Sequence, residues 1–355
     1  MRIGIPKEIK VLEGRVALIP AAAAELVRMG HEVYLETSAG ILSGYQDAAY
    51  QAIGAQIVPD AKALYDTAQM VLKVKEPQAT EFDLLRRDHV LFSYLHLAAE
   101  PVLLKALQDI GLTAVAFETV QEANGSLPLL APMSDIAGRI ATQVGTHLLH
   151  RPQGGKGILL GGLPSVERGK VVILGAGVAG GNAAVVAAAM GAQVVVFDHN
   201  REKMEKMRAL GPNVSGLYPF DNLIKREVAT ADLLIGAVLV TGERAPHLVD
   251  AETVRKMEAG SVIIDISVDQ GGCIETTRPT NYAEPTFTWE GVVHFGVTNM
   301  PGAVPRSSSQ AISAALIPYV LQLADHGCDS TASLRHGINV RGGEIIHPAL
   351  QRELA

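Results

Sequence analysis

Short apolar runs rich in β-branched residues alternate with stretches of helical periodicity along the first 120 residues. These runs predict strands at residues 2–5, 32–35, 70–74, 90–93 and 113–117. Helical patterns cover residues 20–29 and 101–109 between the strands. Such an alternation is typical of an α/β domain that is built on a mostly parallel sheet.

A second series of predicted strands follows at residues 171–174, 194–198, 232–236, 261–265 and 292–296. Long helices are predicted at residues 134–150 and 310–325, on either side of this series. We therefore predict two Rossmann-like α/β domains with mostly parallel sheets, joined by long helices around a central cleft. Residues 1–130, completed by residues 305–355, form the first domain, and residues 131–304 form the second.

Composition and charge narrow the range of partners. Hydrophobic residues make up 48% of the chain and charged residues 19%, which is enough apolar material for folded cores and excludes a mainly disordered chain. The net charge of −7 and the lack of any basic run argue against a nucleic-acid surface, because phosphate contacts need clustered Lys and Arg. We expect small-molecule substrates, no nucleic acid, no membrane, and association with copies of the same chain.

The cysteines and the N-terminal segment bear on the compartment. Only Cys273 and Cys328 could pair, which does not resemble a secreted disulfide framework. The N-terminal segment meets charges too early for a signal peptide, so we expect a cytoplasmic protein. Residues 171–197 contain no charge and are long enough to span a membrane, but their glycines and changing periodicity predict a strand–helix–strand unit instead.

That unit carries the strongest motif in the chain. Gly175, Gly177 and Gly180 stand in the order G-x-G-x-x-G, after an apolar strand and at the start of an Ala- and Val-rich helix. Gly175 allows the tight turn, Gly177 lets the backbone approach a pyrophosphate, and Gly180 permits close packing of the helix on the sheet. In this context the glycines predict a dinucleotide site at the helix N-terminus; the alternative is that they only shape a turn.

The acidic residue at the end of the next strand distinguishes the two nicotinamide dinucleotides. The Asp198 carboxylate can accept hydrogen bonds from both adenosine ribose hydroxyls and would repel a 2′-phosphate, so we predict NAD rather than NADP. Otherwise Asp198 only caps a strand. Lys203, one helical turn further, could support the ribose or be an ordinary solvated lysine.

The first domain offers several groups for a substrate. Arg15 could hold a substrate carboxylate in a paired planar fork, or lie in a surface loop. Lys73 and Lys75 alternate within an apolar strand, so both would point to one face, where one could reach a cleft; alternatively they protect an edge strand. His96 follows a strand end, where ligands bind in open α/β sheets, and could exchange protons near neutrality, although a lone histidine is more often structural.

The second domain adds two aspartates and an amide. Asp265 and Asp269 flank a strand end, and Asp269 could form a proton relay with His96 beside the nicotinamide. Both aspartates could instead form turns before the glycines that follow. The Asn299 amide suits a ribose or a carboxamide, and its alternative role is also turn formation.

The combination of these segments resembles one known family. In chain order, MRIGIPKEIKVLEGRVALIP, VKEP, SYLHLA, GAGVAG, VDQGG and TNMPGAVPR resemble the alanine dehydrogenases over essentially the whole chain. More distantly, the chain is similar to the NAD-binding subunit of the proton-translocating nicotinamide nucleotide transhydrogenase. The resemblance implies reversible, NAD-dependent oxidative deamination of L-alanine to pyruvate, ammonia and NADH by a homohexamer. It also implies that residues 1–130 bind substrate and residues 131–304 bind NAD.

The resemblance implies roles for single residues. Arg15 and Lys75 match the substrate-binding pair, and His96 and Asp269 match the acid–base residues. Ser134 matches an NAD contact, although it could also be the N-cap of the helix that it opens. The full set of implied NAD contacts comprises Ser134, Gly175, Gly177, Val178, Gly180, Asp198, Lys203, Val238, Leu239, Ile266, Ser267, Val268, Asp269, Arg278, Val297, Asn299 and Met300.

The sequence also bears on a metal site and on two alternative functions. Gln322 and His326 lie four residues apart on the predicted C-terminal helix, where some family members hold a metal ion, but glutamine is a weak ligand and we predict no metal. A transhydrogenase subunit is one alternative function, yet it needs no amino-acid site. A noncatalytic NAD-binding protein is the other, and it leaves Arg15, Lys75 and His96 unexplained.

Overall fold

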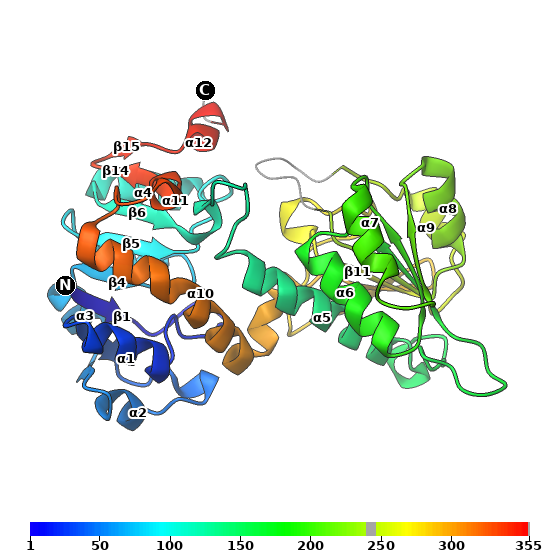
Figure 1. Ribbon diagram of the computed structural model, residues 1–355, viewed down its shortest axis with the longest axis horizontal. Helices are drawn as coiled ribbons and strands as arrows, with labels where there is room; N and C mark the ends of the chain where they lie inside the picture. The colour runs from blue at the N-terminus through cyan, green and yellow to red at the C-terminus, as the bar shows by residue number, and fades with distance from the viewer. Residues whose placement is uncertain (239–245, 354–355) are drawn as a thin grey trace. The chain divides into compact units, whose positions relative to one another are not determined.

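The computed structural model describes residues 1–238 and 246–353, which form two compact units (Figure 1). Unit 1 comprises Met1–Met133 and Gly302–Ala355, and unit 2 comprises Ser134–Pro301. Each unit has its own sheet with helices packed against it, and both sheets are mostly parallel. The predicted α/β fold class with two domains is confirmed, and unit 1 is assembled from both ends of the chain.

Unit 1 has an eight-stranded sheet in the order β15-β14-β6-β5-β4-β1-β2-β3. Its strands are β1 (Arg2–Ile5), β2 (Glu32–Glu36), β3 (Gln56–Val58), β4 (Met70–Leu72), β5 (Val90–Ser93), β6 (Thr113–Ala116), β14 (Ile338–Arg341) and β15 (Glu344–Ile345). Strands β1 to β6 pair in parallel, whereas β14 pairs antiparallel with β6 and β15 antiparallel with β14. β1 and β4 are neighbours at the point where the strand order reverses.

The helices of unit 1 begin and end at residues that suit those positions. Both α1 (Pro20–Arg28) and α4 (Pro101–Ile110) carry proline in the first turn, where its fixed φ favours the helix, and α4 ends at a left-handed Gly111. The remaining helical segments are α2 (Asp47–Gln51), α3 (Ala61–Thr67), α10 (Pro305–His326), α11 (Ala332–Gly337), α12 (Pro348–Glu353), η1 (Ile41–Ser43), η2 (Ala79–Leu84) and η3 (Phe117–Thr119).

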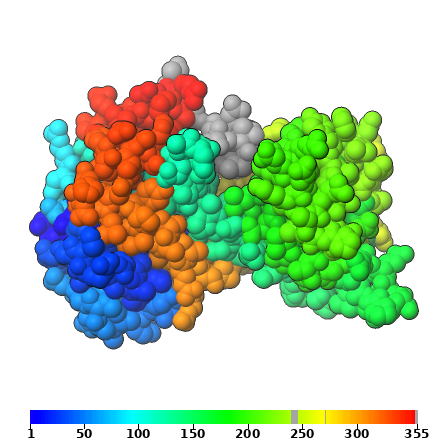
Figure 2. All heavy atoms as spheres, viewed as in Figure 1, coloured from blue at the N-terminus to red at the C-terminus, as the bar shows by residue number. Residues whose placement is uncertain are grey.

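The returning C-terminal segment completes unit 1. On the face drawn in Figure 2, its orange and red atoms adjoin the blue and cyan atoms of the first residues. Within α10, the Ser309 hydroxyl accepts the Val16 N–H and the Ser313 hydroxyl accepts the Ile19 N–H, both at 2.9 Å. The loop that follows β1 is therefore anchored on a helix encoded nearly 300 residues later.

Unit 2 has a seven-stranded sheet in the order β12-β13-β11-β10-β7-β8-β9. Among these described strands, β12 pairs antiparallel with β13 and all other pairs are parallel. Its strands are β7 (Lys170–Leu174), β8 (Gln193–Phe197), β9 (Val214–Leu217), β10 (Leu233–Gly236), β11 (Val262–Asp265), β12 (Thr286–Trp289) and β13 (Val292–Phe295). The order from β9 to β13 is that of the dinucleotide-binding fold, and unit 1 repeats it from β3 to β6.

Helices cover both faces of this sheet, which explains why its central strands are continuously apolar. All four residues of β10 and of β11 are buried. The helical segments of unit 2 are α5 (Ala131–Leu148), whose first turn belongs to unit 1, α6 (Val178–Ala189), α7 (Arg201–Arg208), α8 (Asp221–Ala229), α9 (Ala251–Arg255), η4 (Arg151–Gln153), η5 (Val268–Gln270) and η6 (Met300–Ala303).

Several elements differ from those predicted. Strands β3, β9, β12, β14 and β15 were missed. All five lie at or next to the edge of a sheet, and polar residues among their two to four positions leave no long apolar run. The helix predicted from residue 134 begins at Ala131, so Ser134 lies inside the helix and its interpretation as an N-cap is wrong. The helix predicted from residue 310 begins at Pro305, and α10 lies wholly within unit 1.

The uncharged stretch between residues 171 and 197 divides into β7, α6 and β8, as its glycines predict. Among the described residues, no helix has the length and apolar character needed to cross a membrane. Cys273 and Cys328 are both free thiols.

Candidate functional site

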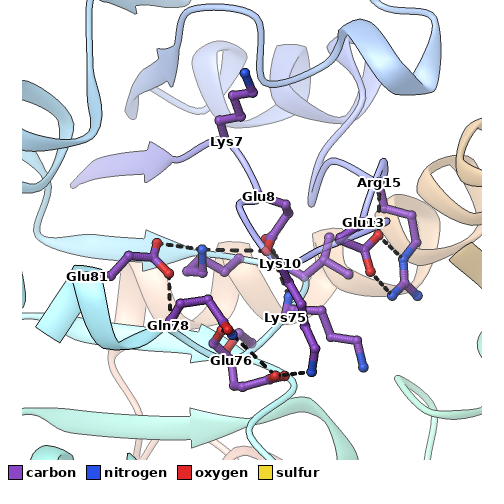
Figure 3. Close-up of polar contacts among 12 residues, drawn as sticks. Lys7, Glu8, Lys10, Glu13, Arg15, Lys75, Glu76, Gln78 and Glu81 are labelled. Carbon is purple, nitrogen blue, oxygen red and sulfur yellow. Dashed lines mark hydrogen bonds and ion pairs between the residues drawn. The ribbon is translucent and has the colours of Figure 1, made fainter. Parts of the chain in front are cut away.

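The candidate site of unit 1 lies at the carboxyl ends of β1 and β4. The loop after β1 carries Arg15, and the loop after β4 carries Lys75. Figure 3 shows charged side chains from both loops gathered in this region. Open α/β sheets bind their ligands where the strand order reverses, which is the position of these two loops.

Arg15 is buried, so its alternative interpretation as a surface-loop arginine is wrong. The residue is 2% exposed. Its Nε donates to Glu13 Oε1 at 2.6 Å, its Nη2 donates to Glu13 Oε2 at 2.5 Å, and its Nη1 lies 3.1 Å from Met133 Sδ. Burial alone would lower the pKa of Arg15, but the hydrogen bond and charge of Glu13 outweigh burial and raise it. The guanidinium is thus a permanent cation in a fixed position.

Lys75 is a half-buried cation whose charge the carboxylates of Glu76 and Glu13 compensate only in part. Burial lowers the pKa of Lys75, and the charge of Arg15 lowers it further. Glu76 also lies in this region, but its carboxylate is bonded to the Lys10 ammonium (Figure 3). Within residues 1–238 and 246–353, the Lys75 ammonium has neither a hydrogen bond nor an ion pair. An anionic group bound here would relieve the repulsion between Lys75 and Arg15.

Lys73 has a different environment, although the sequence placed it beside Lys75 on one strand. β4 ends at Leu72, so the predicted alternation of the two lysines along a strand does not apply. β4 also lies between β1 and β5, so the edge-strand alternative is wrong. Lys73 is 1% exposed, and its ammonium lies 2.7 Å from Glu81 Oε1 and 3.5 Å from Glu8 Oε2.

His96 follows the end of β5, as predicted. Its backbone has a φ of 48°, in the left-handed region, and its N–H donates to Glu118 Oε1 at 2.6 Å. The imidazole stacks on the Tyr94 ring with a centroid distance of 6.0 Å, and Nδ1 lies 4.0 Å from Glu118 Oε1. A non-glycine residue in this conformation needs support from its surroundings, which Glu118 supplies. The side chain stays 45% exposed and accessible for proton exchange.

In unit 2, the glycine turn joins β7 to α6. Gly175 has a φ of 96°, and a Cβ there would lie 2.6 Å from the Ala237 carbonyl oxygen. A Cβ on Gly180 would lie 1.8 Å from the Gly175 carbonyl oxygen. A Cβ on Gly177 would meet nothing within 4 Å, so the backbone at the start of α6 borders open space. A helix N-terminus with such an open approach fits the pyrophosphate of a dinucleotide.

Asp198 follows β8 and braces this turn. Its Oδ2 accepts the Ala176 N–H at 2.8 Å, and its Oδ1 accepts the Asn200 N–H at 2.8 Å. Lys203 Nζ lies 3.8 Å from Asp198 Oδ2, and the lysine side chain is 46% exposed. An acidic group at the end of the second strand of this fold fits the adenosine ribose of NAD.

The two aspartates after β11 have different environments. Asp265 is fully buried and accepts hydrogen bonds from Ser267 N, Cys273 N and Thr277 Oγ1 at 2.8 to 3.0 Å. Burial raises its pKa in spite of these bonds, and the carboxyl group organises the loop, in agreement with its turn-forming interpretation. Asp269 lies in η5 and is exposed, so it is the aspartate of this pair that solvent and ligands can reach.

Most of the other positions implied by the resemblance also lie in unit 2. Val178 begins α6, and Arg278 stacks over the Phe287 ring at 4.4 Å. Asn299 has a left-handed φ of 59°. Leu239 lies outside the described residues. The rest follow the ends of β10, β11 and β13 and comprise Val238, Ile266, Ser267, Val268, Val297 and Met300.

Sequence reasoning missed the carboxylates that hold the site in unit 1. These are Glu8, Glu13, Glu81 and Glu118, all of which contact a candidate residue or its backbone. Only Glu8 and Glu13 offered a signal, since both stand in the segment around Arg15 that the resemblance covers. Among the described residues, no group of three or more His, Cys, Asp and Glu side chains could hold a metal ion.

Comparison with known proteins identifies the family. The alanine dehydrogenase/PNT N-terminal domain model matches residues 4–137, and the C-terminal domain model matches residues 141–348. The alanine dehydrogenase of Bacillus subtilis is 48% identical, with 100% of this chain and 95% of that protein covered. A solved L-alanine dehydrogenase superposes with a TM-score of 0.97 at 51% identity, covering 100% of this chain and 99% of that one.

A transhydrogenase from Sinorhizobium meliloti superposes with a TM-score of 0.85 at 26% identity, covering 98% of this chain and 100% of that one. It is therefore the more distant of the two solved structures. The resemblance seen in the sequence motifs is confirmed: the chain belongs to the alanine dehydrogenase/PNT family.

Proposed function

We propose that this protein is an L-alanine dehydrogenase, which catalyses the reversible NAD-dependent oxidative deamination of L-alanine to pyruvate, ammonia and NADH. Identity of 48% with an alanine dehydrogenase over the whole chain favours this activity over that of the transhydrogenase, which is 26% identical. The noncatalytic alternative leaves the charged site of unit 1 without a purpose.

One observation carries the assignment of a carboxylate substrate. Lys75 is a half-buried cation of lowered pKa that stands near the permanent charge of Arg15. Two cations in such an arrangement are stabilised by an anion, and a small amino acid or oxo acid supplies a carboxylate of suitable size. We therefore assign substrate binding to Arg15 and Lys75, and hence to unit 1.

Unit 2 is assigned to NAD. The open backbone at Gly177 and the N-terminus of α6 would bind the pyrophosphate, and Asp198 would bind the ribose hydroxyls. Ser134, Lys203, Arg278 and Asn299 are proposed as further contacts. When bound, NAD accepts the hydride that leaves Cα of alanine.

The chain's own groups would carry out the proton transfers. Loss of hydride leaves an iminium on the substrate, and Arg15 and Lys75 would hold its carboxylate still while water adds to the carbon. His96 would take a proton from the attacking water and return one to the departing ammonia, and Asp269 would activate the water or steady the imidazole. The exposed His96 ring has the access that this exchange requires.

The test is an absorbance assay of NADH formation by the purified protein across small amino acids. We expect turnover with L-alanine, and loss of turnover in His96→Ala with NAD binding retained. Absence of activity with every small amino acid would overturn the proposal. Hydride exchange between nucleotides that depends on a membrane partner would instead support the transhydrogenase.

We also propose that the enzyme is a cytoplasmic homohexamer. The family resemblance suggests the hexamer, and the two free thiols suit a reducing compartment. Sedimentation equilibrium on the purified protein tests the assembly, and the mass of six chains is the expected result.

A further inference from the structure

The Lys73 ammonium joins three segments of unit 1. It follows β4, and it lies 2.7 Å from Glu81 Oε1 in η2 and 3.5 Å from Glu8 Oε2 in the loop after β1. Glu81 Oε1 also accepts the Tyr65 hydroxyl at 2.8 Å. A lysine that is 1% exposed is costly to bury, and these two carboxylates compensate its charge.

Glu8 connects this ammonium to Lys75. While Oε2 faces Lys73, Oε1 accepts the Val74 N–H at 2.6 Å and lies 3.4 Å from the Lys75 N–H. The two oxygens of one carboxylate therefore tie a buried cation to the backbone of the two residues that follow it. Figure 3 shows Glu8 between the segment of Glu81 and that of Lys75.

The sheet holds the preceding residues but stops short of Lys75. Lys73 N donates to Phe92 O at 3.1 Å, and Tyr94 N donates to Val74 O at 3.2 Å, so pairing with β5 continues for two residues past the end of β4. At Lys75 the backbone N–H turns to Glu8 instead. Glu8 Oε1 therefore accepts hydrogen bonds from the backbone on both sides of the Val74–Lys75 peptide, where pairing with β5 ends.

Without the Lys73 charge, the buried Glu8 carboxylate would lose the ammonium that it faces at 3.5 Å. Burial raises the pKa of Glu8, and the Lys73 charge is the main influence that lowers it. Glu13 and Glu81 also raise the pKa of Glu8, since all three are buried carboxylates. Removal of the ammonium would leave like charges facing one another, which favours protonation or movement of Glu8.

We propose that Lys73 is a positioning residue for substrate recognition: it fixes the Glu8 carboxylate, which fixes the backbone at Lys75 and thereby aims the Lys75 ammonium. Lys73 itself has no access to a substrate. This inference rests on the proposed role of Lys75 in binding the substrate carboxylate.

The experiment compares Lys73→Met with a matched control, Lys156→Met. Lys156 is a lysine of unit 2 whose ammonium lies 2.6 Å from both Asp232 and Glu258, with its side chain 11% exposed. We expect both variants to lower the midpoint of thermal unfolding. Only Lys73→Met should raise the KM for pyruvate, by about tenfold or more, the effect of losing one charge-assisted hydrogen bond. The Kd for NADH should stay within about twofold of the wild-type value in both variants. Lys73→Met leaves unit 2 unchanged, and Lys156 lies far from the glycine turn that would bind the pyrophosphate.

A double-variant cycle separates positioning from general loosening. In a Lys75→Met background, Lys73→Met should change the KM for pyruvate by less than about twofold, because the ammonium that it aims is gone. An unchanged KM in Lys73→Met, or a rise of equal size in both backgrounds, would overturn the inference. If Lys73→Met does not fold, the fallback is the double variant Lys73→Met/Glu81→Gln, which removes a positive and a negative charge together. Its KM for pyruvate is measured with and without Lys75→Met. A raised KM that depends on Lys75 supports the inference, and an unchanged KM overturns it.

The inference and the proposed function fail separately. A wild-type protein that turns over no amino acid or oxo acid overturns the function. An active wild type together with an unaltered KM in Lys73→Met overturns only the role of Lys73.

Discussion

Lys75 makes substrate binding sensitive to pH. Burial and Arg15 lower the pKa of Lys75 below its ordinary value, whereas a bound carboxylate would favour the charged form and raise the pKa again. Affinity for pyruvate should therefore be full at pH values below the lowered pKa and should fall as pH rises through it. The measurement is the KM for pyruvate as a function of pH, and Lys75→Met should remove this fall. A wild-type KM that stays flat up to about pH 10.4, the ordinary lysine pKa, would contradict the prediction.

Asp198 should determine the choice of dinucleotide. In Asp198→Asn the side chain can still accept the Ala176 N–H, but it no longer repels a 2′-phosphate. We expect the ratio of the Kd values for NADP and NAD to fall by about tenfold or more, which corresponds to about 1.4 kcal/mol. Lys206→Met, at an exposed position of α7, is the control, because it leaves both Asp198 and Lys203 in place. Equal ratios in wild type and Asp198→Asn would show that specificity lies elsewhere.

The site residues that could be identified from the sequence are those whose side chains are unusual next to their neighbours in the chain. Glycines after an apolar strand and a lysine next to an apolar run stand out without any knowledge of the fold. Glu81 could not be found in this way, because its role arises from Lys73 and Tyr65, which reach it from other segments. The burial of Arg15 was missed for the same reason, since α10 anchors its loop from the far end of the chain.

Helices α5 and α6 pack with their backbones in close approach. A Cβ on Gly138 of α5 would lie 2.0 Å from the Ala179 carbonyl oxygen of α6. Gly138→Ala should therefore separate the two helices and lower the free energy of unfolding by about 1–3 kcal/mol. Chemical denaturation monitored by circular dichroism measures this effect.

Gly181→Ala is the matched control within α6. Its Cβ would meet only the Met207 Cε at 3.6 Å, an ordinary contact, and alanine favours the helix by about 0.8–1 kcal/mol over glycine. The two substitutions should therefore shift stability in opposite directions. Stabilisation by both would show that α5 and α6 tolerate a wider spacing.

Strands with an apolar run were predicted to within a few residues, whereas short strands with polar residues near the sheet edges were not. β14 and β15 lie at one edge of their sheet and β12 at the edge of the other, and they comprise two to four residues each. The alternation of TFTW in β12 and INVR in β14 covers only four residues, which is too short to distinguish a strand from a loop. β14 also pairs with β6, a strand distant in sequence, whereas β12 and β15 pair with strands adjacent to them in the chain. The antiparallel strands of both sheets therefore escaped the sequence analysis.

Both units should lose stability in mild acid. Burial lowers the pKa of His89 in unit 1 and of His294 in unit 2 below the ordinary value. The His89 Nδ1 accepts the Arg86 N–H, a bond that protonation would break. The unfolded chain binds these protons at about pH 6.5, so this stability is complete above that pH and is lost as pH falls toward the folded pKa values.

Urea denaturation at pH 7 and at lower pH values checks this expectation. The free energy of unfolding should decrease as pH falls below about 6.5. His89→Gln should reduce the decrease, because glutamine does not titrate. A stability that is unchanged between the two conditions would contradict the prediction.

The same strand order in both units explains why the domain plan was accessible from sequence. Each unit places a β–loop–α transition at the reversal of its strand order, and those transitions carry the recognisable motifs. The antiparallel pairing of β14 with β6 could not be predicted from the sequence, because no local pattern relates residues that lie more than 200 positions apart.

The assembly of unit 1 from both chain ends has a consequence for synthesis on the ribosome. Every residue of unit 2 is translated before β14 exists, so unit 2 can close its sheet while β6 still has an open edge. The loop of Arg15 likewise lacks its hydrogen bonds to Ser309 and Ser313 until α10 has been made. The usual order, in which the first-made domain folds first, is thus reversed. A nascent chain stalled when Pro301 has just left the ribosome should hold a protease-resistant unit 2 and a protease-sensitive beginning, with substrate recognition the last property to appear.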